Sequence, residues 1–119
     1  MSANKRKGTA WESAIVSYLR DKGFSYAERR ALSGNLDKGD LTGVPGLVVE
    51  AKSVKSFDLS GWLNEAEKER DNAKADVGVV WIKRARYTSP GRAYVVMSGD
   101  DLVWLLKAAG YGPSTEAAA

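Results

Sequence analysis

The spacing of hydrophobic residues changes along the chain, and each spacing predicts a type of secondary structure. Apolar residues at intervals of three and four predict helices over residues 9–22, 58–75 and 98–109. Short apolar runs predict strands over residues 24–32, 47–52, 77–83 and 93–97, and another short strand near Asp40. The predicted order of helix, three strands, helix, two strands and helix indicates an α/β fold with a mixed sheet.

The first predicted helix carries a candidate functional residue at the edge of its apolar face. Thr9 and Glu12 have the spacing of a capping box, and Gly23 is typical of the position after a helix. Glu12 therefore has two interpretations, as a helix cap or as a carboxylate directed toward a site, and one residue can serve both. The predicted apolar stripe consists of Trp11, Ala14, Ile15, Tyr18 and Leu19.

The two later helices are each predicted to bury one face. The stripe of the second helix consists of Leu59, Trp62, Leu63, Ala66 and Ala73, and that of the last consists of Leu102, Leu105, Leu106 and Ala109. The charged residues of the second helix are expected to face solvent, namely Glu65, Lys68, Glu69 and Asp71. Asn64 is the polar residue of this helix that we expect nearest to the strands before it.

One stretch of the chain is predicted to bring charged residues together in space. The Val-Pro-Gly sequence at residues 44–46 is a turn signal, since proline presets φ and glycine accepts a positive φ. Strands joined by this turn would pair positions that sum to about 89–91, so Asp40 would face one of residues 49–51. Because side chains alternate along a strand, Glu50 and Lys52 share one face.

Two carboxylates and an ammonium group on one small surface suggest chemistry. Mg²⁺ prefers oxygen ligands, typically one or two carboxylates with water, and Asp40 and Glu50 could supply them. Lys52 could then hold a phosphate oxygen or orient an attacking water without touching the metal. The alternative is an edge hairpin whose charges are solvated and form a salt bridge.

Residue types that are missing from the sequence narrow the chemistry further. The chain has no cysteine and no histidine, which excludes disulfides, zinc-thiolate sites, thiol nucleophiles, serine–histidine triads and histidine-dependent nucleases. Hydrolysis would therefore depend on carboxylates, lysine, hydroxyl groups or a metal ion that they hold.

The length and the hydrophobic content predict one folded unit. With 119 residues, 44% of them hydrophobic, we expect a flexible basic arm over residues 1–8, a single domain over 9–110 and a disordered tail over 111–119. No apolar run is long enough to span a membrane and no signal peptide precedes the first helix, so we expect no membrane partner and a cytoplasmic location.

The positive charge favours a polyanionic partner. The net charge is +3, and the densest basic segment surrounds Tyr87 and the turn at residues 89–91. We interpret this segment as a loop that contacts a phosphate backbone, in preference to a solubilising hairpin tip. The candidate DNA-binding cations are Lys5, Arg6, Lys7, Arg29, Arg30, Lys83, Arg84, Arg86 and Arg92.

Glu12 on a helix, followed by Gly39-Asp40 and then by Glu50-Ala51-Lys52, resembles the PD-(D/E)XK nuclease superfamily. Within it, the chain looks most like the small Holliday junction resolvases of archaea and of bacterial viruses. Residues 7–12 (KGTAWE) are similar to their opening pattern of basic residue, glycine and glutamate, and residues 22–24 (KGF) are similar to their first turn. The resemblance covers residues 5–106 and departs at Gly39, where the superfamily has proline.

The resemblance implies a restriction-endonuclease-like core that binds Mg²⁺ or Mn²⁺ and cuts two symmetric strands of a four-way DNA junction as a homodimer. Asp40 and Glu50 would ligate the metal, with the Ala51 carbonyl as a further ligand. Glu12 would complete the metal site or hold a water molecule beside it. Lys52 would orient the attacking water and steady the phosphate.

The resemblance carries three further expectations. Ser33, in the loop before Asp40, would contact the scissile phosphate. One or more of Trp62, Trp81 and Trp104 would lie at the dimer interface, since they are bulky for so small a core. The protein would be encoded by a virus that replicates in a bacterial host.

Two alternative functions remain. One is another restriction-like or structure-specific endonuclease, and the other is a non-catalytic DNA-binding module with the same fold. The intact set of Glu12, Asp40, Glu50 and Lys52 favours an enzyme, because a protein that only binds DNA has no need of clustered acids facing phosphates.

Overall fold

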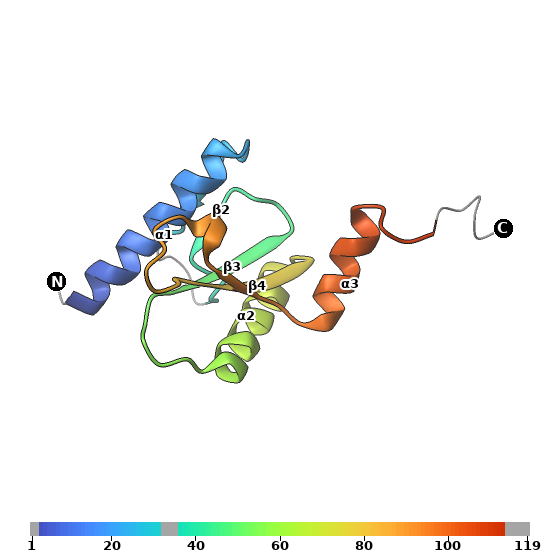
Figure 1. Cartoon of the computed structure of the whole chain (residues 1–119). Coiled ribbons are helices and arrows are strands. Elements are labelled where there is room, and N and C mark those ends of the chain that lie inside the picture. Colours follow the sequence, from blue (N-terminus) through green and yellow to red (C-terminus); the bar gives the residue numbers. More distant parts are fainter. Residues whose placement is uncertain (1–2, 32–35, 114–119) are drawn as a thin grey trace.

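The computed structural model describes residues 3–31 and 36–113, and its elements follow the predicted order (Figure 1). The helices are α1 (Ala3–Asp21), α2 (Leu59–Ala73) and α3 (Gly99–Ala108). The strands are β1 (Glu28–Arg29), β2 (Leu41–Thr42), β3 (Leu47–Lys52), β4 (Val77–Ile82) and β5 (Tyr94–Val96), and a short 3-10 turn, η1 (Pro90–Arg92), precedes β5. The predicted α/β fold with a mixed sheet is confirmed.

The central sheet has the strand order β3-β4-β5. Strands β3 and β4 are parallel, with Glu50 opposite Val80 and Lys52 opposite Ile82, and β5 runs antiparallel to β4. All residues of β4 are buried, in agreement with the continuous apolar run from which this strand was predicted. Because the connection from β3 through α2 makes these strands parallel, their C-terminal ends lie at the same end of the sheet.

Helices α1 and α2 cover opposite faces of the sheet and make a three-layer core (Figure 1). On the α1 side, Trp11 and Ile15 pack with Val49 and with the odd-numbered residues of β4. On the α2 side, Ala66 packs with the even-numbered residues Val80 and Ile82. Gly78 permits this close packing, since a Cβ there would lie 2.6 Å from the Ala66 carbonyl oxygen.

The predicted turn before β3 is present, but the predicted hairpin is only partly formed. The Leu47 N–H donates to the Val44 carbonyl oxygen at 3.2 Å, and Gly46 has a φ of 85°, as a type II turn requires. Strand β2 nevertheless pairs with β1 and not with β3. What remains of the hairpin is a single bond from the Asp40 N–H to the Val49 carbonyl oxygen at 2.9 Å, a pairing whose positions sum to 89.

Two predicted element boundaries near the N-terminus are wrong. Helix α1 begins at Ala3 and not at the expected cap Thr9, so residues 3–8 of the predicted flexible arm are helical. The strong helix formers in the basic run outweigh Gly8, which lies inside the helix. Over the described residues 24–31, the strand predicted over residues 24–32 is reduced to β1, because Phe24 and Tyr26 are exposed and, of these residues, only Ala27 enters the core.

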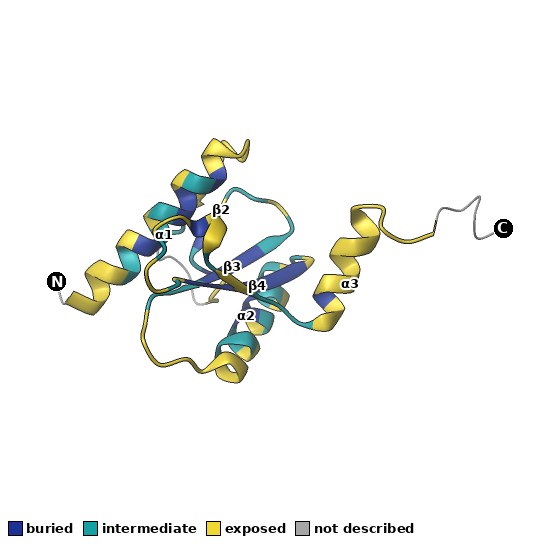
Figure 2. Ribbon diagram, viewed as in Figure 1, coloured by how far each residue is buried: buried dark blue, intermediate teal, exposed yellow. Residues whose placement is uncertain are grey.

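Helix α3 begins at its predicted cap but does not bury its predicted face. The Ser98 hydroxyl accepts a hydrogen bond from the Asp101 N–H at 3.1 Å. Asp101 is buried and accepts hydrogen bonds at 2.8 Å from the Gly78 N–H and from Arg70. The remainder of the helix projects away from the sheet (Figure 2). The apolar residues Leu102, Val103, Trp104, Leu105 and Leu106 are consequently exposed, and the predicted core role of this face is wrong.

No helix in the described parts of the chain is long and apolar enough to cross a membrane. Residues 111–113 follow α3 without regular structure, and the rest of the predicted tail lies outside the described residues.

Candidate functional site

Asp40 lies beside the free edge of β3, where backbone groups fix its side chain. The Ala51 N–H donates to Asp40 Oδ2 at 2.8 Å, two residues beyond the bond between Asp40 and Val49. Because the N–H and C=O groups of one strand residue point to the same side, the Ala51 carbonyl is directed toward this edge as well. Carboxylate and carbonyl oxygens therefore gather at one corner of the sheet.

Glu50 and Glu69 meet in the space between β3 and α2. Glu50 is 7% exposed and Glu69 is 1% exposed. Their carboxylates are close enough to share a proton, and the Asp40 carboxylate approaches Glu50 in the same way. Burial, together with these two neighbouring carboxylates, raises the pKa of Glu50 to about 11. In the absence of a cation, Glu50 therefore holds a proton at neutral pH.

The pKa of Glu69 is raised less than that of its neighbour. Burial is the largest cause and brings the pKa of Glu69 to about 7, although the hydrogen bond with Glu50 lowers it. The negative charges of Asp37, Glu65 and Asp40 raise the pKa of Glu69 further. Around this pair, therefore, negative charge accumulates from three parts of the chain.

Asp37 joins this cluster from the segment before β2. Side-chain oxygens of Asp37, Glu50 and Glu69 lie within 4.8 Å of one another. The Gly39 N–H donates to Asp37 Oδ1 at 3.0 Å, and the Asn72 side chain of α2 donates to the Asp37 carbonyl oxygen at 2.9 Å. The bond from Gly39 fixes the local conformation of the segment, and the bond from Asn72 holds it against α2.

Gly39 is required by the path of this segment. Its φ is 95°, and a Cβ there would lie 2.9 Å from the Val48 side chain and 3.0 Å from the Val49 carbonyl oxygen. Proline is locked at a negative φ and could not adopt this conformation. Glycine is therefore required by the backbone of this chain at the position where the resembled pattern has proline.

Lys52 lies on the same face of β3 as Glu50, as the alternation predicted. Its Nζ atom is 3.5 Å from the Glu65 carboxylate on α2 and 5.7 Å from the centre of the Trp62 ring. The ammonium group is therefore held between the sheet and α2, and Lys52 lies two residues after Glu50 on β3.

Glu12 approaches the site from α1, on the other side of Asp40. It forms an ion pair with Arg29 at 3.0 Å. Burial raises the pKa of Glu12, Arg29 opposes this shift, and the nearby charge of Asp40 adds to it. Glu12, Asp40 and Glu50 thus form a continuous series of interacting carboxylates that continues to Glu69 and Asp37.

The prediction that Glu69 faces solvent is wrong, and Glu69 is the site residue that sequence reasoning missed, whereas the Glu65 side chain remains partly exposed. A signal was present, because Trp62, Ala66, Glu69 and Ala73 follow one another at helical spacing on a single face. A charged residue within such a stripe is a candidate for a functional position. Asn64, which we expected nearest to the strands, is exposed, as are the remaining charged residues Lys68 and Asp71.

The basic loop between β4 and β5 begins at the C-terminal end of β4, next to the C-terminal end of β3. The Lys83 N–H donates to the Lys52 carbonyl oxygen at 2.9 Å, so the loop leaves the sheet beside the end of β3. Arg84 and Arg92 stack on the Tyr87 ring at 4.1 and 5.6 Å. Of the other loop cations, Lys83 and Arg86 are exposed.

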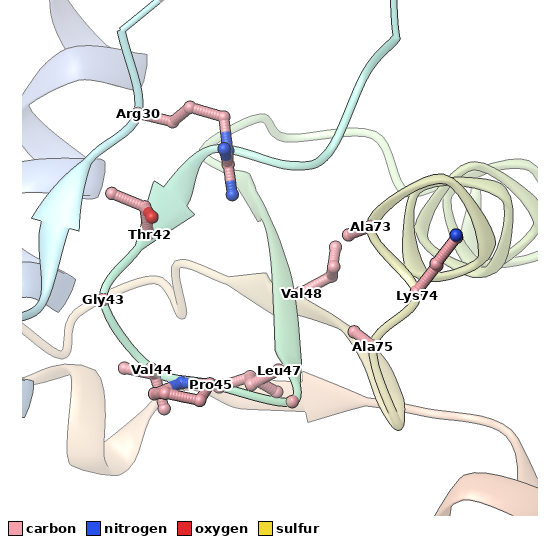
Figure 3. Close-up of a pocket in the computed structure, with 11 residues that line it drawn as sticks. Arg30, Thr42, Gly43, Val44, Pro45, Leu47, Val48, Ala73, Lys74 and Ala75 are labelled. Atoms are coloured by element: carbon pink, nitrogen blue, oxygen red, sulfur yellow. The ribbon is translucent and has the colours of Figure 1, made fainter.

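The remaining candidate cations are dispersed. Lys5, Arg6 and Lys7 lie in the first turns of α1, and Arg29 is occupied by Glu12. Arg30 reaches into a cavity of about 250 Å³ between β2, β3 and the end of α2, whereas Lys74 at its rim points away (Figure 3). Ser33 lies outside the described residues.

Comparisons with family models, with curated proteins and with solved structures found no match, so the resemblance to nucleases rests on the residues of this chain.

Proposed function

We propose that this protein is a Mg²⁺-dependent endonuclease with a restriction-endonuclease-like core, acting as a Holliday junction resolvase within the cytoplasm. The observation that carries the proposal is the convergence of Asp40, Glu50 and Lys52 at the edge of the sheet where the basic loop begins. Acidic residues that face a polyanion need a cation between them, and this arrangement supplies the ligands for one.

The donor set fits a hard divalent cation. Asp40 and Glu50 would hold Mg²⁺, or Mn²⁺ in its place, with the Ala51 carbonyl as a further oxygen ligand. When bound, the ion would polarise the scissile phosphodiester and lower the pKa of an attacking water. Glu12 would add negative charge next to Asp40 and so strengthen cation binding.

Lys52 is suited to the phosphate and not to the metal. Its ammonium is held by Glu65 and by the Trp62 face, which restricts its position without neutralising it in a close ion pair. A phosphate at the edge of the sheet could draw this group away from Glu65, since the phosphate oxygens offer a stronger partner than a carboxylate at 3.5 Å. Lys52 would then orient both the phosphate and the attacking water.

The loop between β4 and β5 would bind the DNA backbone. Tyr87 holds the guanidinium groups of Arg84 and Arg92 against its ring, and Arg84 also donates to the Arg92 carbonyl oxygen at 3.5 Å, so the two cations would meet a phosphate backbone from fixed positions. The loop lies beside the end of β3, so a strand gripped by these cations would pass the acidic cluster.

A second copy of the chain would complete the enzyme. A four-way junction has two-fold symmetry, and paired cuts need two sites at a fixed spacing. Of the three tryptophans expected at an interface, Trp81 is buried in the core and Trp62 packs against Phe57, whereas Trp104 is exposed on α3. We therefore assign the apolar face of α3, residues 102–106, to contact between the two copies.

The proposal is tested by incubating the purified protein with a synthetic four-way junction and with a linear duplex of the same sequence. We expect symmetric cuts in the junction with Mg²⁺, no cuts in EDTA, and little cutting of the duplex. Equal cutting of both substrates would instead indicate a general or restriction-like endonuclease. Binding without any cutting, in either metal, would indicate a non-catalytic DNA-binding module.

A further inference from the structure

The α2 side of Glu50 contains a second group of oxygen ligands that the proposed Asp40 site does not use. Asp37, Glu50 and Glu69 come from the segment before β2, from β3 and from α2, and their side-chain oxygens lie within 4.8 Å of one another. Two oxygens bound to one ion lie at most two metal–oxygen bonds apart, which is about 4.2 Å for Mg²⁺ and about 5.2 Å for Ca²⁺. The spacing therefore suits one divalent cation with little movement.

Glu69 is the independent observation that points to a ligand in this cluster. Its side chain is almost completely buried, and no N–H or hydroxyl group of the described residues donates to its carboxylate oxygens, so its neighbours offer it only the proton of Glu50. A buried carboxylate without a donor is strongly unfavourable unless a proton or a cation compensates it. Two such carboxylates side by side increase the need for compensation.

The nearby basic side chains are engaged with other carboxylates. Lys52 pairs with Glu65, and Arg70, although next to Glu69 in sequence, pairs with Asp101 at 2.8 Å. Asp37, by contrast, accepts hydrogen bonds from the Gly39 N–H at Oδ1 and from the Asn72 side chain at its carbonyl oxygen, and these bonds leave its Oδ2 atom for a ligand. The segment is thus positioned before any ion binds, as a metal site requires.

We propose that Asp37, Glu50 and Glu69 bind a divalent cation of their own, in addition to the cation held by Asp40 and Glu50. Glu50 would contribute to both ions, which is the arrangement of two-metal phosphodiesterases, with ions about 3.5–4 Å apart. The inference rests on the proposed function for its catalytic meaning, but the binding of the second ion does not require that any DNA be cut.

The test is the number of Mn²⁺ ions bound per chain, measured from the loss of the free Mn²⁺ electron paramagnetic resonance signal at neutral pH without DNA. We expect two ions for the unmodified protein, one for Glu69→Gln, one for Asp40→Asn, and two for the control Glu67→Gln. The control lies on the same helix, pairs with Arg70 at 3.8 Å and is outside the cluster. Two ions in Glu69→Gln, or a single ion in the unmodified protein, would overturn the inference.

A second variant shows whether a lost ion results from the missing ligand or from misfolding. Asp37 is exposed, so Asp37→Asn should fold normally and keep the oxygen that bonds to Gly39, yet it should also lose one ion. Junction cutting separates this inference from the proposed function. Two ions without cutting would contradict the nuclease alone, whereas cutting with one ion would contradict the second site alone.

Discussion

Glu50 on β3 and Glu69 on α2 bury their carboxylates against each other in the space between sheet and helix. Two like charges in a buried position lower stability unless a proton or a cation lies between them. An apolar pair would pack at this position without that penalty. We therefore expect the stability of the protein to depend on pH and, through the proposed cations, on divalent metal.

The first prediction concerns pH in EDTA. Burial raises the pKa of Glu69 to about 7, above the value of 4.5 expected for an unfolded chain. A group with a raised pKa in the folded state contributes stability below its unfolded pKa and loses it as pH rises through the folded pKa. The melting temperature of the metal-free protein should therefore fall between pH 5 and pH 8.

Glu69→Gln provides the comparison for this prediction. The variant lacks the titrating carboxylate, so its melting temperature should change less between pH 5 and pH 8 than that of the unmodified protein. Mn²⁺ should restore stability at pH 8 in the unmodified protein, because it binds the folded state preferentially. Identical pH profiles for the two proteins in EDTA would contradict the raised pKa.

The second prediction concerns Gly39. Alanine at this position must adopt a φ of 95° and place a Cβ 3.0 Å from the Val49 carbonyl oxygen. Gly39→Ala should lower the free energy of unfolding by about 1–3 kcal/mol in chemical denaturation. Gly8→Ala is the control, because Gly8 lies within α1 with open space around it, and alanine there should stabilise by about 0.5–1 kcal/mol. A neutral Gly39→Ala would show that this backbone path is not required.

The order of elements could be predicted from the hydrophobic pattern, because β4 is a continuous apolar run and the buried faces of α1 and α2 have helical spacing. The pairing of Asp40 with Val49 followed from the turn at residues 44–46. The position of α3 could not be predicted in the same way. Its apolar stripe predicts a buried face, but the periodicity does not distinguish burial within the chain from burial against a second copy.

The acidic site was predictable only in part, for a related reason. Asp40, Glu50 and Lys52 are close in sequence, so strand geometry brings them together. Asp37 reaches the cluster through tertiary packing, which local patterns do not encode, whereas the position of Glu69 in the apolar stripe of α2 was a local signal. Charged residues were assigned to the exposed face of α2, and this general expectation concealed Glu69 within the apolar stripe.

The third prediction concerns the basic loop. Replacing both Arg84 and Arg86 with alanine should weaken junction binding and reduce its salt dependence by about one phosphate contact per cation. The cutting rate at saturating protein should change little, since neither residue contacts the acidic cluster. Lys107→Ala, on the exposed side of α3, is the matched control for loss of a charge. An unchanged salt slope in the double variant would remove the loop from the DNA interface.

The fourth prediction concerns the exposed face of α3. Trp104 is 45% exposed, and Trp104→Glu would place a charge in the proposed contact between two copies. Light scattering at micromolar concentration should show a dimer for the unmodified protein and a monomer for the variant. Tyr26→Glu, which alters an exposed aromatic residue far from α3 in the sequence, should remain dimeric. A monomeric unmodified protein in the presence of junction DNA would contradict this assignment.

The most direct test of the nuclease itself is the single-turnover rate at which Glu50→Gln cuts a four-way junction at saturating protein and Mg²⁺. Glutamine keeps the shape of Glu50 and removes the charge that both proposed cations share. We predict a rate roughly 100-fold lower than that of the unmodified protein, which corresponds to a loss of about 2.7 kcal/mol of transition-state stabilisation. Junction affinity in EDTA should stay the same, because Glu50 without a bound cation is already protonated at neutral pH and glutamine removes no charge. A cutting rate near that of the unmodified protein would contradict the metal-nuclease account of Asp40, Glu50 and Lys52.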